Sequence, residues 1–330
     1  MKKIYVCHTQ YHVLITVLKV LKDTNTENEI ILYATIQEVE EIKKRLEAIK
    51  LFEKVYIFKE NDRVLKPIGE NTKNQIEFRK KLKSEIKKYQ NSLCILENKE
   101  IYVFNDDSIV GNYLRLNRKR YNLIEDGLNC YQSIEKHYCF DHTLKERIKT
   151  SLNTPDTCFG KSKFVKEIEV NTKEGITVYI KKKMRELPRK ELFEGLTDQE
   201  KKNIIFVFLG DVELDTIQQA TLLITQPLWK DGFLATEKEQ IQIYQDIIKQ
   251  YAKGQVMIKA HPRDEINYSE NLKGSVVLKK DFPLEVLNFV GKANIDRAIT
   301  ICSTAIDGID FAKEKIKLGY EWMENYKNGK

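Results

Sequence analysis

The chain has 330 residues, of which 42% are hydrophobic and 32% charged, and at roughly 100–200 residues per domain this predicts two domains with real cores. Its 56 basic and 49 acidic residues leave a net charge of +7, far from the concentrated basic surface of a nucleic-acid-binding protein. The composition excludes disorder, a collagen-like repeat and a small disulfide-rich scaffold.

Six cysteines are scattered without a CxxC pair, which predicts reduced thiols in a cytoplasmic protein rather than disulfides or clustered metal ligands. No run of 18 apolar residues occurs, and His8, Gln10 and His12 interrupt the apolar stretch that a signal peptide needs. We therefore expect a cytoplasmic location. The mild positive charge also fits peripheral attachment to the inner face of the membrane, or an anionic substrate.

In chain order, short apolar segments alternate with segments of helical periodicity. The first half predicts strands at residues 4–7, 29–34, 55–58, 101–107 and 121–127, separated by helices at 11–23, 39–52 and 76–89. Residues 143–202 are rich in lysine, glutamate and threonine and predict a connector with a single strand at 176–180. Strands joined by helices indicate βαβ units and a parallel sheet.

The alternation resumes after this connector. Strands are expected at 203–210, 221–228, 255–264, 275–280 and 297–303, with helices at 237–253, 283–290 and 304–313. Two βαβ series predict an α/β protein with two doubly wound domains that face a central cleft. Ligands of open α/β sheets bind beyond the carboxyl ends of the strands, so functional residues are expected in the loops that leave them.

The segment KAHPRD, residues 259–264, leaves one of these strands. Pro262 fixes its own φ angle and disfavours a helical conformation at His261, which predicts a rigid corner at the strand end. A histidine at that edge can donate to a phosphate and act as a general acid near neutral pH. A turn histidine without a ligand is the alternative, and the motif alone favours neither.

Two motifs follow in the same half. STAIDG, residues 303–308, begins where a strand ends; Ser303 and Thr304 would cap a helix whose free N–H groups and dipole favour a phosphate, although an N-cap without a ligand is commoner. FPLEVL, residues 282–287, begins another helix. Glu285 could bind ribose hydroxyls there, but its favourable position beside the helix dipole explains it equally well.

In the first half, NLIEDG, residues 122–127, has two acids between a strand and a glycine. A tight turn explains this pattern, but a carboxylate here could also accept the proton of a sugar hydroxyl. Repulsion between Glu125 and Asp126 would raise one of their pKa values, which suits a base. Gln10 and Gln226 are weaker candidates for substrate contacts, with polar surface turns as the commoner explanation.

The chain has no GxGxxG, GxxxxGK[ST] or GxSxG motif, which excludes the usual nicotinamide, P-loop and hydrolase sites. The pairs Asp106–Asp107 and Asp211/Glu213 lack the spacing or the nearby histidine of a metal site. Neither a metal nor a cofactor is expected.

The segments VCHTQYHVL, NLIEDG, LLITQPL, VMIKAHPRD, FPLEVL and ICSTAID resemble, in this order, the bacterial sialyltransferases of glycosyltransferase family 52 and the related capsular-polysaccharide sialyltransferases. The resemblance covers residues 203–311 well, and 1–15 and 121–127 loosely. It implies a GT-B-type fold of two Rossmann-like domains. Residues 1–195 would bind the acceptor, and residues 196–330 would bind the CMP donor.

The resemblance further implies an inverting, metal-independent transfer of sialic acid from CMP-sialic acid to a terminal galactoside. The expected product is an α-2,3 linkage on a bacterial capsular polysaccharide or lipooligosaccharide. Carried across by position, His261 would be the acid and Glu125 or Asp126 the base, with Asp231 in reserve. The donor or the acceptor would be held by Gln10, Gln226, Lys259, Pro262, Glu285, Ser303 and Thr304.

Three alternatives stay open. Another nucleotide-activated sugar or glycerophosphate transferase of the same fold could use the same phosphate site. A nucleotide-sugar epimerase would act without an acceptor. A non-catalytic glycan- or nucleic-acid-binding module would collect its basic residues on one face, but the lysine-rich helices interleave glutamate, as solvated faces do. No nucleic-acid partner is expected.

Overall fold

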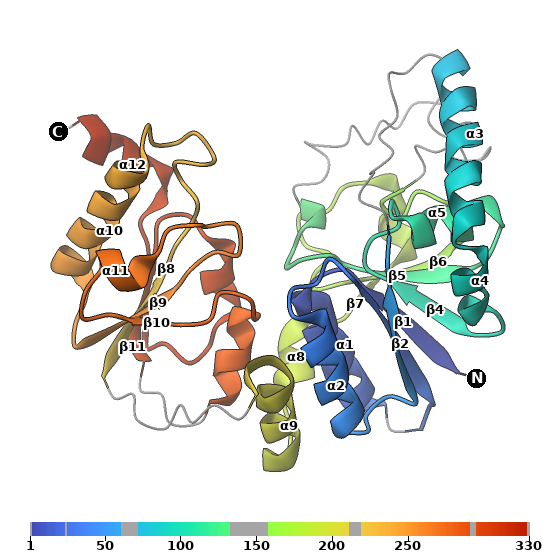
Figure 1. Ribbon diagram of the computed structural model, residues 1–330, viewed down its shortest axis with the longest axis horizontal. Helices are drawn as coiled ribbons and strands as arrows, with labels where there is room; N and C mark the ends of the chain where they lie inside the picture. The colour runs from blue at the N-terminus through green and yellow to red at the C-terminus, as the bar shows by residue number, and fades with distance from the viewer. Residues whose placement is uncertain are drawn as a thin grey trace. The chain divides into compact units, whose positions relative to one another are not determined.

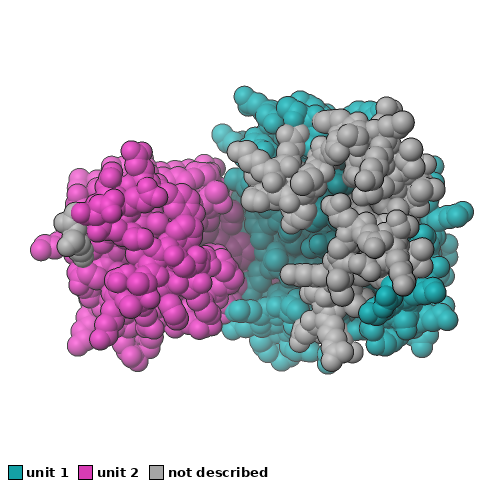
Figure 2. Space-filling model, turned by 90° about the horizontal axis from the view of Figure 1, so that it is seen from above, with its two compact units in different colours: residues 1–196 teal, residues 197–330 magenta. Residues whose placement is uncertain are grey.

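The computed structural model describes residues 2–23, 25–60, 72–132, 158–210, 219–290 and 295–328. The chain divides into two compact units, Met1–Leu196 and Thr197–Lys330 (Figure 2). The division falls one residue after the boundary expected from the sequence. Each unit has its own parallel sheet, so the expected α/β class is confirmed.

Unit 1 contains a seven-stranded sheet with the order β3-β2-β1-β4-β5-β6-β7. The strands are β1 (Lys3–Cys7), β2 (Asn28–Tyr33), β3 (Lys54–Phe58), β4 (Glu100–Val103), β5 (Tyr121–Ile124), β6 (Val165–Val170) and β7 (Met184–Glu186). All of their pairings are parallel. The direction in which successive strands are added reverses between β1 and β4, which makes their carboxyl ends the switch point where ligands of such sheets bind.

Helices cover both faces of this sheet (Figure 1). Helices α1 (Gln10–Lys22) and α2 (Val39–Ala48) lie on one face, and α3 (Thr72–Lys88), α4 (Gln90–Leu93) and α5 (Ile109–Leu116) on the other. The short helix α8 (Arg189–Phe193) packs against α1. Apolar residues of β1, β4, β5 and β6 form one buried cluster with residues from α3 and α5.

The strand expected at 176–180 is wrong. Ile176, Val178 and Ile180 are buried, but they lie in a loop and at the start of a 3₁₀ turn, η2 (Tyr179–Lys183). The strands of this region are β6 and β7 instead. Charged residues concealed β6 in the sequence, because its Glu169 is almost fully buried and is neutralised by Lys19 and Arg185. The alternation of apolar residues at 176–180 therefore predicted correctly that they are buried, but not that they lie outside the sheet.

Unit 2 contains a five-stranded parallel sheet with the order β10-β9-β8-β11-β12. Its strands are β8 (Ala220–Ile224), β9 (Gln255–Lys259), β10 (Val276–Val277), β11 (Ile295–Thr300) and β12 (Glu314–Lys317). The helices are α9 (Asp198–Leu209), α10 (Glu237–Tyr251), α11 (Tyr268–Asn271) and α12 (Gly319–Asn328). Helices α10 and α12 lie side by side, and the Tyr326 hydroxyl of α12 donates to Asp246 of α10 (Figure 1).

Three expected elements of this unit are wrong. Residues 203–210 are not a strand but the end of α9 and its cap, Gly210. Thr197 and Glu200 form a capping box that starts the helix, and a buried helix can show the same continuous apolar run as a strand. The helices expected at 283–290 and 304–313 are only 3₁₀ turns, η3 (Leu284–Phe289) and η4 (Thr304–Gly308). After η4 the chain continues to β12 and α12, which had not been expected.

Candidate functional site

His261 lies at a fixed corner beyond β9. Its backbone N–H donates to Thr225 Oγ1 at 3.4 Å, and its ring Nδ1 accepts the N–H of Arg263 at 3.1 Å. Because Nδ1 is an acceptor, a neutral His261 ring carries its proton on Nε2. Burial, and then the Arg263 charge, lower the pKa of His261, so the neutral form predominates near pH 7. No described residue hydrogen-bonds Nε2, which leaves this donor for a ligand.

A buried aspartate, Asp264, helps to fix this corner through hydrogen bonds. Asp264 is 1% exposed, and its carboxylate accepts hydrogen bonds from the hydroxyls of Thr225 at 3.0 Å and Tyr268 at 2.8 Å and from the Gln240 amide at 3.1 Å. The Thr225 hydroxyl therefore links Asp264 to the backbone of His261. Sequence reasoning had not given Asp264 a role, although it ends the KAHPRD segment.

Asp231, the reserve base, is held by Arg263. The two side chains form a bidentate ion pair with N–O distances of 2.8 and 3.0 Å. The hydrogen bonds from Arg263, and to a lesser degree its charge, lower the pKa of Asp231. A carboxylate with both oxygens bonded to guanidinium is a weak proton acceptor, so this geometry disfavours Asp231 as the base.

Lys259 and Glu285 belong to the same edge of the unit 2 sheet. The Lys259 ammonium donates to the Lys280 carbonyl at 2.7 Å and lies 4.8 Å from the centre of the Phe282 ring. Burial lowers the pKa of Lys259 to about 8. Burial raises the pKa of Glu285, against the opposing charge of Lys259. Glu285 lies against Gly308, where a Cβ atom would come within 3.1 Å of its carboxylate oxygen.

Ser303 and Thr304 follow β11, but they do not begin an α-helix. Turn η4 has five residues, and the Ser303 hydroxyl accepts the N–H of Ala305 at 3.3 Å within it. The expected phosphate site on a helix N-terminus is therefore corrected to two hydroxyls on a tight turn. Thr304 is exposed, whereas Ser303 is half-buried.

Gln226 connects the ends of β8 and β11. Its side-chain oxygen accepts the backbone N–H and the thiol of Cys302, each at 2.9 Å. Its backbone N–H donates to the Tyr244 hydroxyl at 2.7 Å. These contacts make Gln226 a support for the neighbouring Ser303. Pro262, between His261 and Arg263, is exposed.

In unit 1, the two acids of NLIEDG have different surroundings. Glu125 is fully buried, and its carboxylate oxygens accept the backbone N–H groups of Tyr131 at 3.3 Å and Asn171 at 2.7 Å. Burial raises the pKa of Glu125, against these hydrogen bonds. The side chain ties the end of β5 to the loop after β6 and is closed off from solvent. This geometry does not support Glu125 as a base.

Asp126 is the accessible acid. Its side chain is 53% exposed, whereas that of His12, to which it is hydrogen-bonded, is 1% exposed. His12 Nδ1 accepts the backbone N–H of His8 at 3.1 Å, so Nε2–H donates to Asp126 Oδ1. The His12 ring is stacked on Phe104 at 4.2 Å between centroids. Burial alone would raise the pKa of Asp126, but the hydrogen bond from His12 outweighs it, and the pKa is lowered.

Sequence reasoning missed His12, although the signal was present. His8 directly follows β1 and His12 lies in the first turn of α1, Phe104 follows β4 and Glu125 follows β5, and these three strands are neighbours in the sheet. Gln10 is the first residue of α1, and its amide nitrogen donates to the Gln37 carbonyl at 3.1 Å. Its side-chain oxygen is buried, and no residue in the described ranges hydrogen-bonds it.

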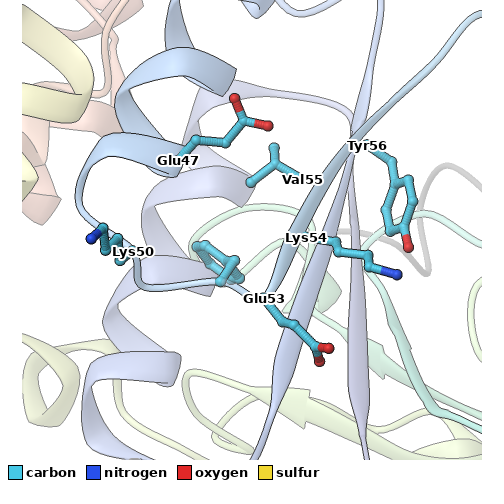
Figure 3. Close-up of a pocket in the computed structure, with 7 residues that line it drawn as sticks. Glu47, Lys50, Glu53, Lys54, Val55 and Tyr56 are labelled. Atoms are coloured by element: carbon cyan, nitrogen blue, oxygen red, sulfur yellow. The ribbon is translucent and has the colours of Figure 1, made fainter.

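A pocket in unit 1 lies elsewhere. It is lined by residues 47, 50 and 52–56, from the end of α2, the loop after it and the start of β3 (Figure 3). This is the amino end of the strands, opposite the edge that carries His12 and Asp126, and none of the residues discussed above lines it. In the described ranges, no group of three or more His, Cys, Asp or Glu side chains could hold a metal ion. None of the helices in these ranges has the length and apolar character that a membrane span requires.

The family described as "Glycosyltransferase family 52" matches residues 68–320, which include most of unit 1 and nearly all of unit 2. The chain belongs to glycosyltransferase family 52. The resemblance inferred from the sequence is thereby confirmed. The protein is a transferase, and membership of the family implies a nucleotide-sugar donor and a glycan acceptor. This family 52 chain is also 32% identical over 247 residues to an uncharacterised protein of Haemophilus influenzae, covering 72% of this chain and 75% of that protein.

Solved structures of the same fold include two enzyme types. The α/β-galactoside α-2,3-sialyltransferase of Photobacterium phosphoreum superposes with a TM-score of 0.56 at 15% identity, covering 95% of this chain and 89% of that chain. The UDP-GlcNAc 2-epimerase of Methanocaldococcus jannaschii gives a TM-score of 0.50 at 15% identity, covering 99% and 92%. At these identities the likeness shows the fold alone. The family 52 protein has a GT-B-like fold.

Proposed function

We propose that the family 52 protein is an inverting sialyltransferase that moves sialic acid from CMP-sialic acid to a terminal galactoside. The observation that carries the proposal is the His261 corner, where a fixed imidazole presents an uncommitted Nε2–H at the carboxyl edge of a sheet. Membership of family 52 and the α-2,3-sialyltransferase fold of the Photobacterium enzyme support the choice of donor. The α-2,3 linkage and a capsular or lipooligosaccharide acceptor are parts of the same proposal.

In the proposed reaction, the bond between the anomeric carbon of sialic acid and the CMP phosphate breaks as an acceptor hydroxyl attacks from the opposite face. Negative charge then accumulates on the departing phosphate. His261 Nε2–H would donate to that phosphate, and Ser303, Thr304 and Lys259 would add hydrogen bonds or charge. Such groups act most strongly where charge develops in the transition state. If these groups stabilise the leaving phosphate sufficiently, the transfer needs no metal ion.

The acceptor hydroxyl must lose a proton as it attacks. We assign that proton to Asp126, because it is accessible and because His12 keeps it ionised and oriented. Glu125 is enclosed by backbone donors and Asp231 is paired with Arg263, so each is a weaker candidate. A well-placed base contributes about 10²–10⁴-fold to such a reaction. Glu285 is left to bind the ribose of CMP.

The deciding experiment is incubation of the purified protein with CMP-sialic acid and lactose. We expect release of CMP and a product heavier than lactose by one sialic acid, which an α-2,3-specific sialidase converts back. CDP-glycerol and other nucleotide-sugar donors serve as parallel arms. Transfer from one of those donors, with none from CMP-sialic acid, would replace the proposed donor while keeping the phosphate site.

A further inference from the structure

Two exposed aromatic side chains lie together at the carboxyl edge of the unit 2 sheet. Large hydrophobic side chains are exposed at only three described positions: Phe233 at 36%, Val276 at 36% and Tyr320 at 49%. Phe233 and Tyr320 contact each other, with ring centroids 5.2 Å apart and an angle of 31° between the rings. We call this pair the aromatic platform. Exposed aromatic surface carries a cost in water, so a paired exposure of this kind suggests a ligand.

The backbone on both sides of the platform is fixed by glycine turns. Gly232, with φ of 79°, precedes Phe233, whose N–H donates to the Leu228 carbonyl at 2.8 Å. Gly319, with φ of 88°, lies just after β12 and precedes Tyr320. Its backbone N–H donates to the Ile301 carbonyl at 2.7 Å. A left-handed φ is costly for other residues. The backbone that carries the two rings is therefore fixed, and the rings contact each other.

Polar groups of the His261 site border the platform. Asp231 is two residues before Phe233 and is fixed by Arg263, whose backbone N–H also holds the His261 ring. On the other side, the Tyr320 phenol contacts the Cys302 thiol. This contact and, to a lesser degree, burial and the Asp231 charge raise the pKa of Tyr320 to about 12, so the phenol stays protonated at neutral pH. Cys302 immediately precedes Ser303.

This combination matches the chemistry of a sugar ring. A pyranose has an apolar face of C–H groups, which packs on aromatic rings, and a rim of hydroxyls, which bond to carboxylates, guanidinium groups and phenols. We propose that the aromatic platform binds a pyranose ring of a substrate, with Asp231, Arg263 and the Tyr320 hydroxyl as partners for its hydroxyls. The inference rests on the proposed function, which supplies the two candidate sugars: the galactoside of the acceptor and the sialic acid of the donor.

The test separates sugar binding from turnover. Saturation-transfer NMR would be recorded on the full-length protein with methyl β-lactoside, and separately with a non-transferable 3-fluoro analogue of CMP-sialic acid. Phe233→Ala and Tyr320→Ala should each weaken binding of one of these two ligands roughly 5–10-fold, as expected for the loss of one aromatic contact. Tyr320→Trp should restore most of the affinity. Val276→Ala is the matched control, because it removes the third exposed large hydrophobic side chain, and should change neither binding constant.

The ligand that loses affinity identifies which sugar the platform holds. Unchanged affinity for both ligands in both alanine variants would overturn the inference, as would an equal loss in Val276→Ala. If the wild-type protein transfers nothing from CMP-sialic acid, the proposed function fails. A loss of lactoside binding in the alanine variants would still support the platform in that case.

Discussion

Two histidines near strand ends, His12 in unit 1 and His261 in unit 2, have the same tautomer but differ in what their Nε2–H can contact. In each, a backbone N–H bonds Nδ1 and leaves the proton on Nε2. His12 is 1% exposed and donates that proton to the Asp126 carboxylate. His261 is half-buried, and no described residue accepts from its Nε2. The difference indicates that one imidazole positions a protein carboxylate, whereas the other is available to substrate.

The largest effect should come from removing the free imidazole. His261→Ala should lower kcat by about 10³-fold, because it removes the Nε2–H hydrogen bond to the leaving phosphate, which strengthens as negative charge develops there. The affinity for CMP should fall much less, since the contribution is greatest in the transition state. Steady-state kinetics and calorimetric titration with CMP would measure the two changes. Turnover like that of the wild type would remove His261 from the mechanism.

The next comparison is between the two adjacent acids. Asp126→Asn should lower transfer by about 10²–10³-fold with little change in CMP affinity, because an amide cannot accept the acceptor proton. Glu125→Gln should keep its activity per folded molecule. It should lose roughly 1–3 kcal/mol of stability, since an amide NH₂ would face a backbone N–H where the carboxylate now accepts.

Activity assays and chemical denaturation of both variants distinguish the two roles. The reverse pattern, with Asp126→Asn active and Glu125→Gln folded but inactive, would return the base to Glu125. If both variants turn over normally, Asp231→Asn becomes the next test.

A smaller effect is expected from His12→Phe, which keeps an aromatic ring beside Phe104 but removes the hydrogen bond to Asp126. We expect a loss of about 10-fold in kcat/KM at neutral pH, typical of a lost positioning contact. In the wild type, the hydrogen bond from His12 lowers the pKa of Asp126. Without it that pKa rises, so the acid limb of the pH–rate profile should move to higher pH. An unshifted limb would show that His12 does not act on the titrating base.

No effect is expected from chelation. The proposed site stabilises the leaving phosphate with an imidazole, two hydroxyls and a lysine, so EDTA should leave the transfer rate within about twofold, less than the loss of any single group above. The assay would follow CMP release before and after dialysis against EDTA. Loss of activity that magnesium or manganese restores would contradict this chemistry and point to a metal held by the substrate.

Local patterns in the sequence determined most of the architecture. Runs such as IYVC and TLLI can be buried on both faces of a parallel sheet, and turn-forming residues end them. The segments KAHPRD, STAIDG and NLIEDG lie where such runs end, so their place at the carboxyl edge of a sheet could be predicted. Where local signals conflicted, prediction failed. The end of α9 looked like a strand, and the charged β6 looked like a connector.

Only the tertiary structure decided which of two neighbouring acids is accessible. Glu125 and Asp126 are one residue apart, and successive residues of an extended chain project to opposite sides. Glu125 therefore accepts the backbone N–H groups of Tyr131 and Asn171, whereas Asp126 accepts a hydrogen bond from His12. Tyr131 is only six residues from Glu125, but Asn171 and His12 lie 46 and 114 residues from the acids they contact, and no local pattern carries their positions. The aromatic platform depends in the same way on Phe233 and Tyr320, which lie 87 positions apart along the chain.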